Sequence, residues 1–242
     1  MIRAARRGAV ALLTIDRPER RNAVNADMCD ALLDGLRDAL GADARVLVLT
    51  GAGGHFCAGA DLGGVEDDRF RIALRTFLLA LADAPIPTIA AVEGFALGAG
   101  MQLAAACDLR VAAPDARFGI PAAKLGLMVD HWTVRRVQRV AGEGTARAML
   151  LAAEEVDGDA AVRLGLAQRS GRLEDALSWA DQIALLAPLT LAGHKLALNR
   201  FGPEPEPDAL VDAAIAKAWG SADLREGMVA FKERRRPHFK GE

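Results

Sequence analysis

The sequence lacks the features that would assign it to several specialised classes of protein. Its three cysteines form no CxxC pair, and its four histidines do not join them at the spacing of metal ligands. No uncharged apolar stretch reaches the roughly 18 residues of a membrane span, so neither export nor membrane insertion is predicted. Its net charge of -2 lacks the basic excess typical of a nucleic-acid binder. We therefore expect a cytoplasmic protein without a metal, in which the cysteines are small buried hydrophobic residues.

The sequence does contain enough apolar material for one sizeable domain, with 52% hydrophobic residues in a chain of 242. Short apolar runs typical of strands, such as residues 9–16 and 46–49, alternate with helical patterns in the first half of the chain. Asn25 stands where the N-cap of the first helix is expected. This alternation is typical of a mainly parallel sheet covered by helices.

The second half of the sequence has a different character. From Thr133 onward it predicts one Ala- and Leu-rich helix after another, with a connector at residues 202–207 that contains three prolines. We therefore predict an α/β protein made of a β/α core, residues 1–190, and a helical C-terminal region, residues 191–242.

Two loops rich in small residues each follow an apolar strand, at residues 51–62 and 94–103. Small residues let backbone N–H groups approach a ligand closely, and the second loop also leads into a helix N-terminus, which favours negative charge. Two such loops side by side would offer two N–H donors to one carbonyl oxygen, an oxyanion hole. On spacing alone an ordinary tight turn is the better explanation, because neither dinucleotide-binding nor P-loop spacing is present.

Four longer stretches of the sequence, found in a fixed order, together give stronger evidence of function than the two loops do. They are TIDRPERRNAV, LVLTGAGGHFCAGADL, IAAVEGFALGAGMQLAAACDLRVA and EGMVAFKERRRPHFKGE. The chain resembles the enoyl-CoA hydratase/isomerase (crotonase) family from residue 10 to its end. It is most similar to a subgroup from mycobacteria and related actinobacteria, in which Asp-x-Trp follows Lys-x-Gly-Leu. The resemblance implies a crotonase spiral of ββα units, with a helical C-terminal region that assembles trimers or dimers of trimers.

The resemblance also implies which residues hold an acyl-CoA thioester, with coenzyme A as part of the ligand and no separate cofactor. The backbone N–H groups of Ala60 and Ala99 would bind the thioester oxygen. The family usually has glycine at the second position, and alanine serves there if the backbone dihedrals tolerate a methyl group. The nucleotide part of coenzyme A would lie against Arg20, Arg21, Ala23, Ala60, Asp61, Leu62 and Gly63, with Phe231 and Arg234 supplied by a neighbouring subunit.

Arginine suits this ligand because its guanidinium offers several charge-assisted donors to a phosphate. Taken singly, however, Arg20, Arg21 and Arg234 are explained equally well as solvated surface residues.

Both catalytic glutamates of the resembled hydratases are missing. Hydration of an enoyl thioester needs a base to activate water and an acid to protonate carbon, and two glutamates serve these roles in the family. The corresponding positions here hold Gln102 and Ala122. An amide has no useful basicity near neutral pH, and a methyl group neither holds nor activates water. We therefore predict a protein of fatty-acid metabolism that binds long acyl-CoA thioesters with little or no hydratase turnover.

A replacement acid remains as an alternative. Asp130 falls near the place where dehalogenases of the resembled family carry a nucleophilic aspartate, and His131 beside it is a candidate base. The simpler interpretations are a helix cap for Asp130, a surface position for His131, and a pocket wall or core position for Trp132. Two other functions therefore stay open, a different acyl-CoA enzyme acting through Asp130 and an active hydratase or isomerase.

Overall fold

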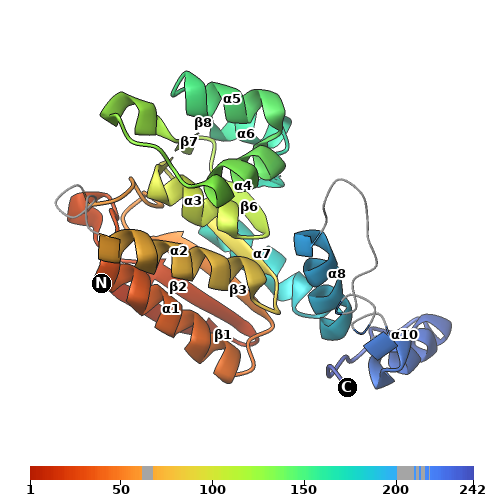
Figure 1. Cartoon of the computed structure of the whole chain (residues 1–242). Helices are drawn as coiled ribbons and strands as arrows, with labels where there is room; N and C mark the ends of the chain where they lie inside the picture. The colour runs from red at the N-terminus through yellow and green to blue at the C-terminus, as the bar shows by residue number, and fades with distance from the viewer. Residues whose placement is uncertain (62–67, 201–209, 211–212, 214–215, 218) are drawn as a thin grey trace.

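The computed structural model describes residues 1–61, 68–200, 210, 213, 216–217 and 219–242 (Figure 1). A six-stranded sheet with the order β1-β2-β3-β4-β6-β9 forms its centre. β1 and β2 form an antiparallel pair, and every other pair of neighbours in this sheet is parallel. The strands are β1 (Ile2–Arg7), β2 (Val10–Ile15), β3 (Val46–Gly51), β4 (Thr88–Val92), β6 (Leu109–Ala112) and β9 (Arg169–Ser170).

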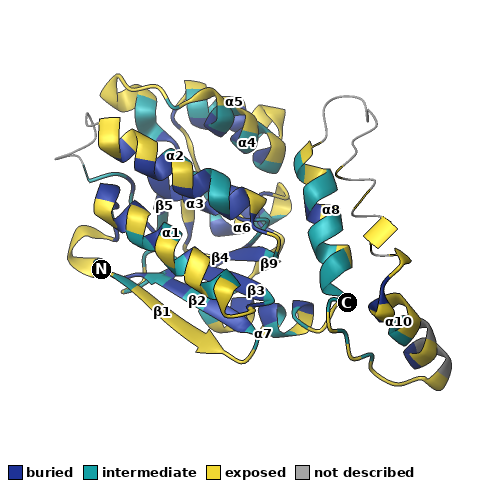
Figure 2. Ribbon diagram, turned by 60° about the horizontal axis from the view of Figure 1, so that its bottom comes forward, coloured by how far each residue is buried: buried dark blue, intermediate teal, exposed yellow. Residues whose placement is uncertain are grey.

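Helices cover both faces of this sheet, which therefore has two apolar layers (Figure 2). On one face lie α1 (Ala26–Gly41), α2 (Asp68–Asp83) and α3 (Ala99–Ala106), and on the other lies α7 (Leu173–Ile183). Strands buried on both faces read as continuous apolar runs, which explains why β3 and β4 are apolar except for one threonine each.

A second, three-stranded sheet with the order β5-β7-β8 lies next to α3. Its strands are β5 (Phe95–Leu97), β7 (Arg117–Gly119) and β8 (Glu155–Asp157). The remaining elements are the short helices η1 (Pro18–Arg20) and η3 (Pro121–Leu125), and the helices α4 (His131–Ala141), α5 (Glu143–Leu151), α6 (Gly158–Arg163), α8 (Pro188–Arg200) and α10 (Ala222–Glu233). None of the helices in the described part of the chain has the length and hydrophobicity needed to span a bilayer.

The predicted α/β architecture is confirmed, and most of the predicted elements are present. Asn25 caps α1, because its side-chain oxygen accepts a hydrogen bond from the N–H of Met28 at 3.0 Å. β1 was not expected, because most of its side chains are exposed and give no apolar alternation. The predicted boundary between residues 190 and 191 falls inside α8.

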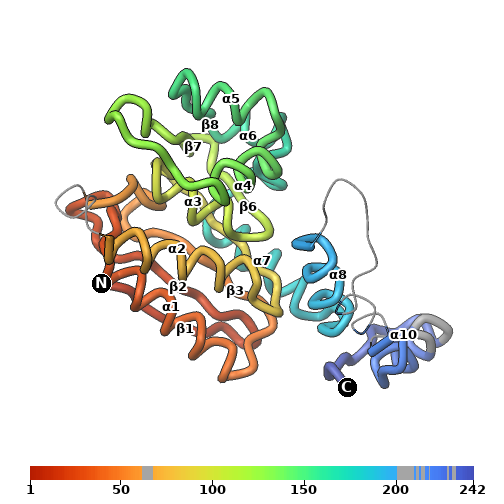
Figure 3. The backbone as a smooth tube through the Cα atoms, viewed as in Figure 1, coloured from red at the N-terminus to blue at the C-terminus, as the bar shows by residue number. Residues whose placement is uncertain are grey.

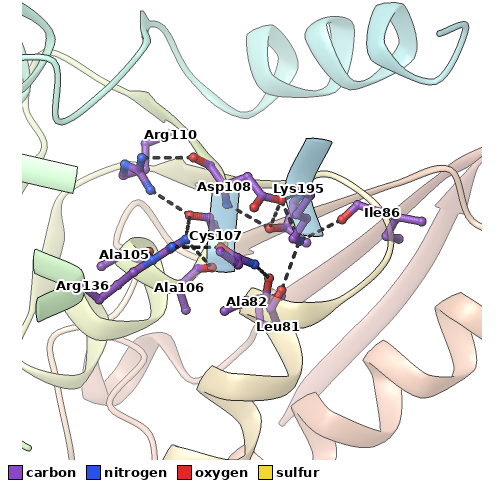
Figure 4. A network of polar contacts seen from close by, with 12 residues as sticks. Leu81, Ala82, Ile86, Ala105, Ala106, Cys107, Asp108, Arg110, Arg136 and Lys195 are labelled. Atoms are coloured by element: carbon purple, nitrogen blue, oxygen red, sulfur yellow. Dashed lines mark hydrogen bonds and ion pairs between the residues drawn. The ribbon is translucent and has the colours of Figure 1, made fainter. Parts of the chain in front are cut away.

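Buried cations hold α8 against the core (Figure 4). Lys195 of α8 pairs with Asp108 at 2.7 Å and donates to the carbonyl of Ile86 at 3.0 Å, just beyond the end of α2. Arg110 and Arg136 donate to the backbone carbonyls that end α3, those of Ala104, Ala105, Ala106 and Cys107. The last carbonyls of a helix have no partner within it and carry partial negative charge, so the guanidinium groups of Arg110 and Arg136 stabilise this end of α3.

Candidate functional site

Three chain segments run parallel to one another and deliver both small-residue loops to one place. Cys57 forms a parallel bridge with Ala96 of β5, and Ala96 in turn pairs in parallel with Phe118 of β7. Because the segments are parallel, the chain leaves all three at the same edge. The loop after Cys57, the loop before α3 and the start of η3 therefore meet there.

Glycines allow the two loops to pack with their backbones almost in contact. A Cβ atom on Gly100 would lie 2.0 Å from the carbonyl oxygen of Cys57, which no real side chain permits. One on Gly98 would lie 3.9 Å from the Cα atom of Gly59. Gly98 also has a φ of 53°, a conformation that residues with a Cβ rarely adopt. The expected oxyanion residues, Ala60 and Ala99, each directly follow one of these adjacent glycines.

The backbone N–H groups of Ala60 and Ala99 are the two expected oxyanion donors. Neither donates a hydrogen bond to any residue that the structure describes. Ala99 is the first residue of α3, where an N–H has no partner within the helix. The positive φ falls on Gly98, so Ala99 has ordinary helical backbone that accommodates a methyl group.

The two positions of the missing glutamates lie beside these loops. Gln102 is three residues after Ala99 on α3, and its side-chain oxygen accepts a hydrogen bond from the hydroxyl of Thr133 at 3.2 Å. Ala122 lies in η3, three residues after Gly119, which pairs with Leu97 at the end of β5. Its methyl group packs against the main apolar core. The two positions where the resemblance leads us to expect glutamates thus hold an amide and a methyl group.

Asp130 is the N-cap of α4, as one of the two interpretations predicted. Its carboxylate accepts a hydrogen bond from the N–H of Thr133 at 2.8 Å and forms an ion pair with Arg75 of α2. Burial by itself would raise the pKa of Asp130, but the hydrogen bonds from Thr133 and Arg75 outweigh it and lower that pKa. His131 is exposed, also as predicted, and Trp132 is half-buried with Arg75 over its ring at 5.6 Å.

The residues expected to bind the nucleotide of coenzyme A fall into two groups. Residues 20–24 run beside residues 58–61, joined by a hydrogen bond from the N–H of Ala58 to the carbonyl of Arg21 at 2.9 Å. Arg20 and Arg21 are exposed, and Arg21 lies 5.5 Å above the ring of Phe95. Ala23 is half-buried between them and the core. This first group therefore lies together at the edge of the two loops.

The second group, Phe231 and Arg234, lies on α10 or directly after it and is not brought to that edge within one chain. Arg234 directly follows α10 and is exposed, and α10, which carries Phe231, lies far from η1 (Figure 3).

Of the other residues expected to bind the nucleotide, Leu62 and Gly63 lie outside the residues that the structure describes. Asp61 forms an ion pair with Arg17 at 2.8 Å, so its carboxylate neutralises a neighbouring cation.

Sequence reasoning missed three contacts at this site. Thr133 binds Gln102, Arg75 binds Asp130, and His55 stacks on Phe95 with ring centroids 4.8 Å apart. The paired residues lie far apart in the sequence, so no local pattern predicts that they meet.

The cysteines are buried, as expected. Burial raises the pKa of Cys29, Cys57 and Cys107 to about 12, so their thiols stay protonated and unreactive near neutral pH.

Comparison with known proteins identifies the family. The sequence model of the enoyl-CoA hydratase/isomerase family matches residues 5–242. The chain therefore belongs to the enoyl-CoA hydratase/isomerase family, and its fold is the crotonase fold.

The relatives include a protein of Mycobacterium tuberculosis named probable enoyl-CoA hydratase echA6, which is 44% identical over 245 residues and 100% of both chains. A putative enoyl-CoA hydratase of Thermus thermophilus is 38% identical over 96% of this chain and 98% of its own. Among solved structures, an enoyl-CoA hydratase/carnithine racemase from Magnetospirillum magneticum superposes with a TM-score of 0.91 at 30% identity, covering 100% of this chain and 96% of that chain.

Proposed function

We propose that this protein binds fatty acyl-CoA thioesters in the cytoplasm, as part of lipid metabolism, with little or no hydratase turnover. The observation that carries the proposal is the pair of N–H groups on Ala60 and Ala99, which lie on adjacent loops beside Gln102 and Ala122 and have no acceptor among the residues that the structure describes. Two backbone donors converging on one thioester oxygen form an oxyanion hole. Such a hole binds and polarises the thioester whether or not an acid and a base stand beside it.

The chemistry of the surrounding side chains argues against efficient hydration. The oxygen of Gln102 is already hydrogen-bonded to Thr133, and Ala122 has no polar atom. A positioned acid or base contributes about 10²–10⁴-fold to a rate. The loss of both leaves only polarisation of the carbonyl, because neither remaining side chain takes up or releases a proton near neutral pH.

The competing assignment is an acyl-CoA enzyme that uses Asp130. The carboxylate of Asp130 is engaged twice, by the N–H of Thr133 and by Arg75. Each carboxylate oxygen has its own partner, so attack through either oxygen would disturb one of these contacts. A helix cap needs only these contacts, which is why we prefer the capping role.

We also propose that the thioester site is completed by a second copy of the chain, in a trimer or a dimer of trimers. Arg20 and Arg21 lie at the edge of the two loops, whereas α10 lies far from the N-terminal part of the same chain, which Figure 1 colours red. The family resemblance gives Phe231 and Arg234 to a neighbour's site. Light scattering and calorimetric titration with coenzyme A, each on the full chain and on a chain ending at residue 220, test assembly and its link to coenzyme A affinity.

The principal experiment measures binding and turnover on the same sample. We expect calorimetry to detect binding of a long saturated acyl-CoA, while hydration of crotonyl-CoA stays far below that of an active family hydratase assayed in parallel. Turnover comparable to that enzyme would refute the proposal, and so would an absence of acyl-CoA binding.

A single substitution tests the N–H of Ala99 directly. Ala99→Pro removes only that donor, and proline is well tolerated at the first position of a helix. A net hydrogen bond is worth about 0.5–1.5 kcal/mol, so we expect acyl-CoA affinity to fall roughly 2- to 10-fold. Ala99→Ser keeps the N–H and is the matched control. Equal affinity of two folded variants would remove Ala99 from the site.

A further inference from the structure

Asn22 is a fully buried polar residue in the turn between β2 and α1. Its side chain makes three hydrogen bonds, all of them to the backbone. Oδ1 accepts from the N–H of Arg17 at 2.9 Å, and Nδ2 donates to the carbonyls of Ala52 and His55 at 2.8 and 2.5 Å. A carboxamide nitrogen has two hydrogens, so both of its donors are used. Asn22 thus joins this turn to the loop that follows β3.

The backbone of the turn restricts which residue can occupy position 22. Arg21 and Asn22 have φ of 48° and 60°, in the left-handed region where asparagine is enriched over most other residues with a Cβ. Gly51 leaves room for the carboxamide, since a Cβ on Gly51 would lie only 2.7 Å from Nδ2 of Asn22. An aspartate would keep the acceptor and lose both donors. A glycine would keep only the backbone conformation. Asparagine fits both the backbone and the three hydrogen bonds.

The residues that follow Asn22 are hydrogen-bonded to the segment that carries Ala60. The N–H of Val24 donates to the carbonyl of Gly59 at 2.9 Å, and the N–H of Asp61 donates to the carbonyl of Val24 at 2.8 Å. These two bonds make Val24 and Ala60 a parallel β-bridge. In such a bridge, the residue between the two bonded positions directs its own N–H away from the partner segment. The contact with Val24 therefore sets the direction of the Ala60 N–H.

Arg17 connects Asn22 to the same segment by a second route. Its N–H is bound by Oδ1 of Asn22, while its guanidinium pairs with Asp61 at 2.8 Å and donates to the carbonyl of Ala23 at 3.3 Å. Asp61 directly follows Ala60 in the sequence. Loss of the Asn22 carboxamide would leave the N–H of Arg17 without its acceptor, so both connections to Ala60 would loosen.

We propose that Asn22 is a positioning residue of the thioester site, which fixes the direction of the Ala60 N–H without touching the ligand. The inference rests on the proposed function, because it takes this N–H as a donor to the thioester oxygen. A hydrogen bond weakens steeply as its angle departs from linear, so the direction of an N–H decides how strongly it polarises a carbonyl. The carboxamide of Asn22 is occupied by three backbone groups, which leaves it no role at the ligand itself.

The experiment measures the infrared stretching frequency of the thioester carbonyl in a bound long saturated acyl-CoA, isotope-labelled at that carbon. Donors at the oxygen polarise the carbonyl and lower this frequency. Asn22→Gly accepts the left-handed backbone without a carboxamide, and Asn22→Asp keeps the shape of the side chain without its donors. We expect each variant, when saturated with ligand, to lose part of the frequency shift of the parent protein. Acyl-CoA affinity should fall roughly 2- to 10-fold.

The matched control is Asn199→Gly in α8, outside the segments that meet at Ala60. Nδ2 of Asn199 donates to the carbonyl of Ala82 at 2.8 Å, so this substitution also removes a carboxamide that is bound to a backbone carbonyl. It should lower the thermal midpoint of unfolding. The carbonyl frequency and the acyl-CoA affinity should both stay at their parent values.

An unchanged carbonyl frequency in the folded Asn22 variants would overturn the inference, and so would an equal change in the control. Failure of both Asn22 variants to fold would also overturn it, because Asn22 would then be a requirement of the fold rather than of the site. In all these cases the parent protein still binds and polarises the thioester. A parent protein that binds no acyl-CoA, or binds it without a frequency shift, would instead contradict the proposed function, and this inference would fall with it.

Discussion

The ion pair between Lys195 and Asp108 gives the sharpest test of how the C-terminal helices are held. The side chain of Lys195 is 8% exposed and that of Asp108 is 22% exposed, so both charges are largely removed from water. Asp108 also accepts hydrogen bonds from the N–H and the hydroxyl of Thr88, at 2.8 and 3.0 Å. We predict strong energetic coupling between Lys195→Met and Asp108→Leu.

The expected magnitudes follow from what each substitution leaves behind. Removing one partner of a buried pair costs about 3–5 kcal/mol, because the other charge stays buried without compensation. Lys195→Met should lie near the lower end, about 3 kcal/mol, because Asp108 keeps its two bonds from Thr88. Asp108→Leu should cost about 4 kcal/mol, because Lys195 is left facing only the carbonyls of Leu81 and Ile86.

The double variant should be far more stable than the sum of these losses. Replacing a whole buried pair by apolar side chains is often neutral or stabilising, while the loss of the acceptor for Thr88 costs about 1–3 kcal/mol. We therefore expect the double variant to lie within about 2 kcal/mol of the parent protein. Urea unfolding at fixed protein concentration measures all four species, with Lys124→Met, at an exposed lysine, as the control. Additive losses would refute the assignment of a coupled buried pair.

The pair also has a pH signature. Burial lowers the pKa of Lys195, and the nearby charge of Asp108 only partly offsets this effect. Between the folded pKa and the unfolded value of about 10.4, the unfolded state binds more protons than the folded state. Stability should therefore rise with pH through this alkaline interval, and Lys195→Met should remove that rise.

Three further predictions concern the site and the core. Gln102→Glu with Ala122→Glu should raise crotonyl-CoA hydration by at least about 10²-fold, and a folded, thioester-binding double variant that gains nothing would exclude these positions from the active site. Asp130→Ala should cost about 1 kcal/mol of unfolding free energy in urea while Asp130→Asn stays near the parent, and the advantage of the parent over Asp130→Ala should shrink as falling pH passes the lowered pKa of Asp130. The three cysteines should react with a thiol reagent at pH 8 only after denaturation, and rapid labelling of the native protein would contradict their burial.

Much of the local structure could be predicted from the sequence because its signals are local. The apolar runs of β3 and β4 reflect burial on both faces, and Asn25 caps α1 through a hydrogen bond only three residues away. The order of the four family stretches also fixed the fold class. The absence of glutamate at residues 102 and 122 could also be inferred from the sequence, because aligning the chain with the family motifs is enough to find these positions.

The tertiary structure decided which residues far apart in the sequence are in contact. The capping and catalytic interpretations of Asp130 were both compatible with the sequence, and the contacts with Thr133 and Arg75 favour the cap. The pairing of Lys195 with Asp108 has no signal in the sequence. Such a contact depends on how the helices pack against each other. Residues far apart in the sequence show no periodicity or spacing from which their contact could be predicted.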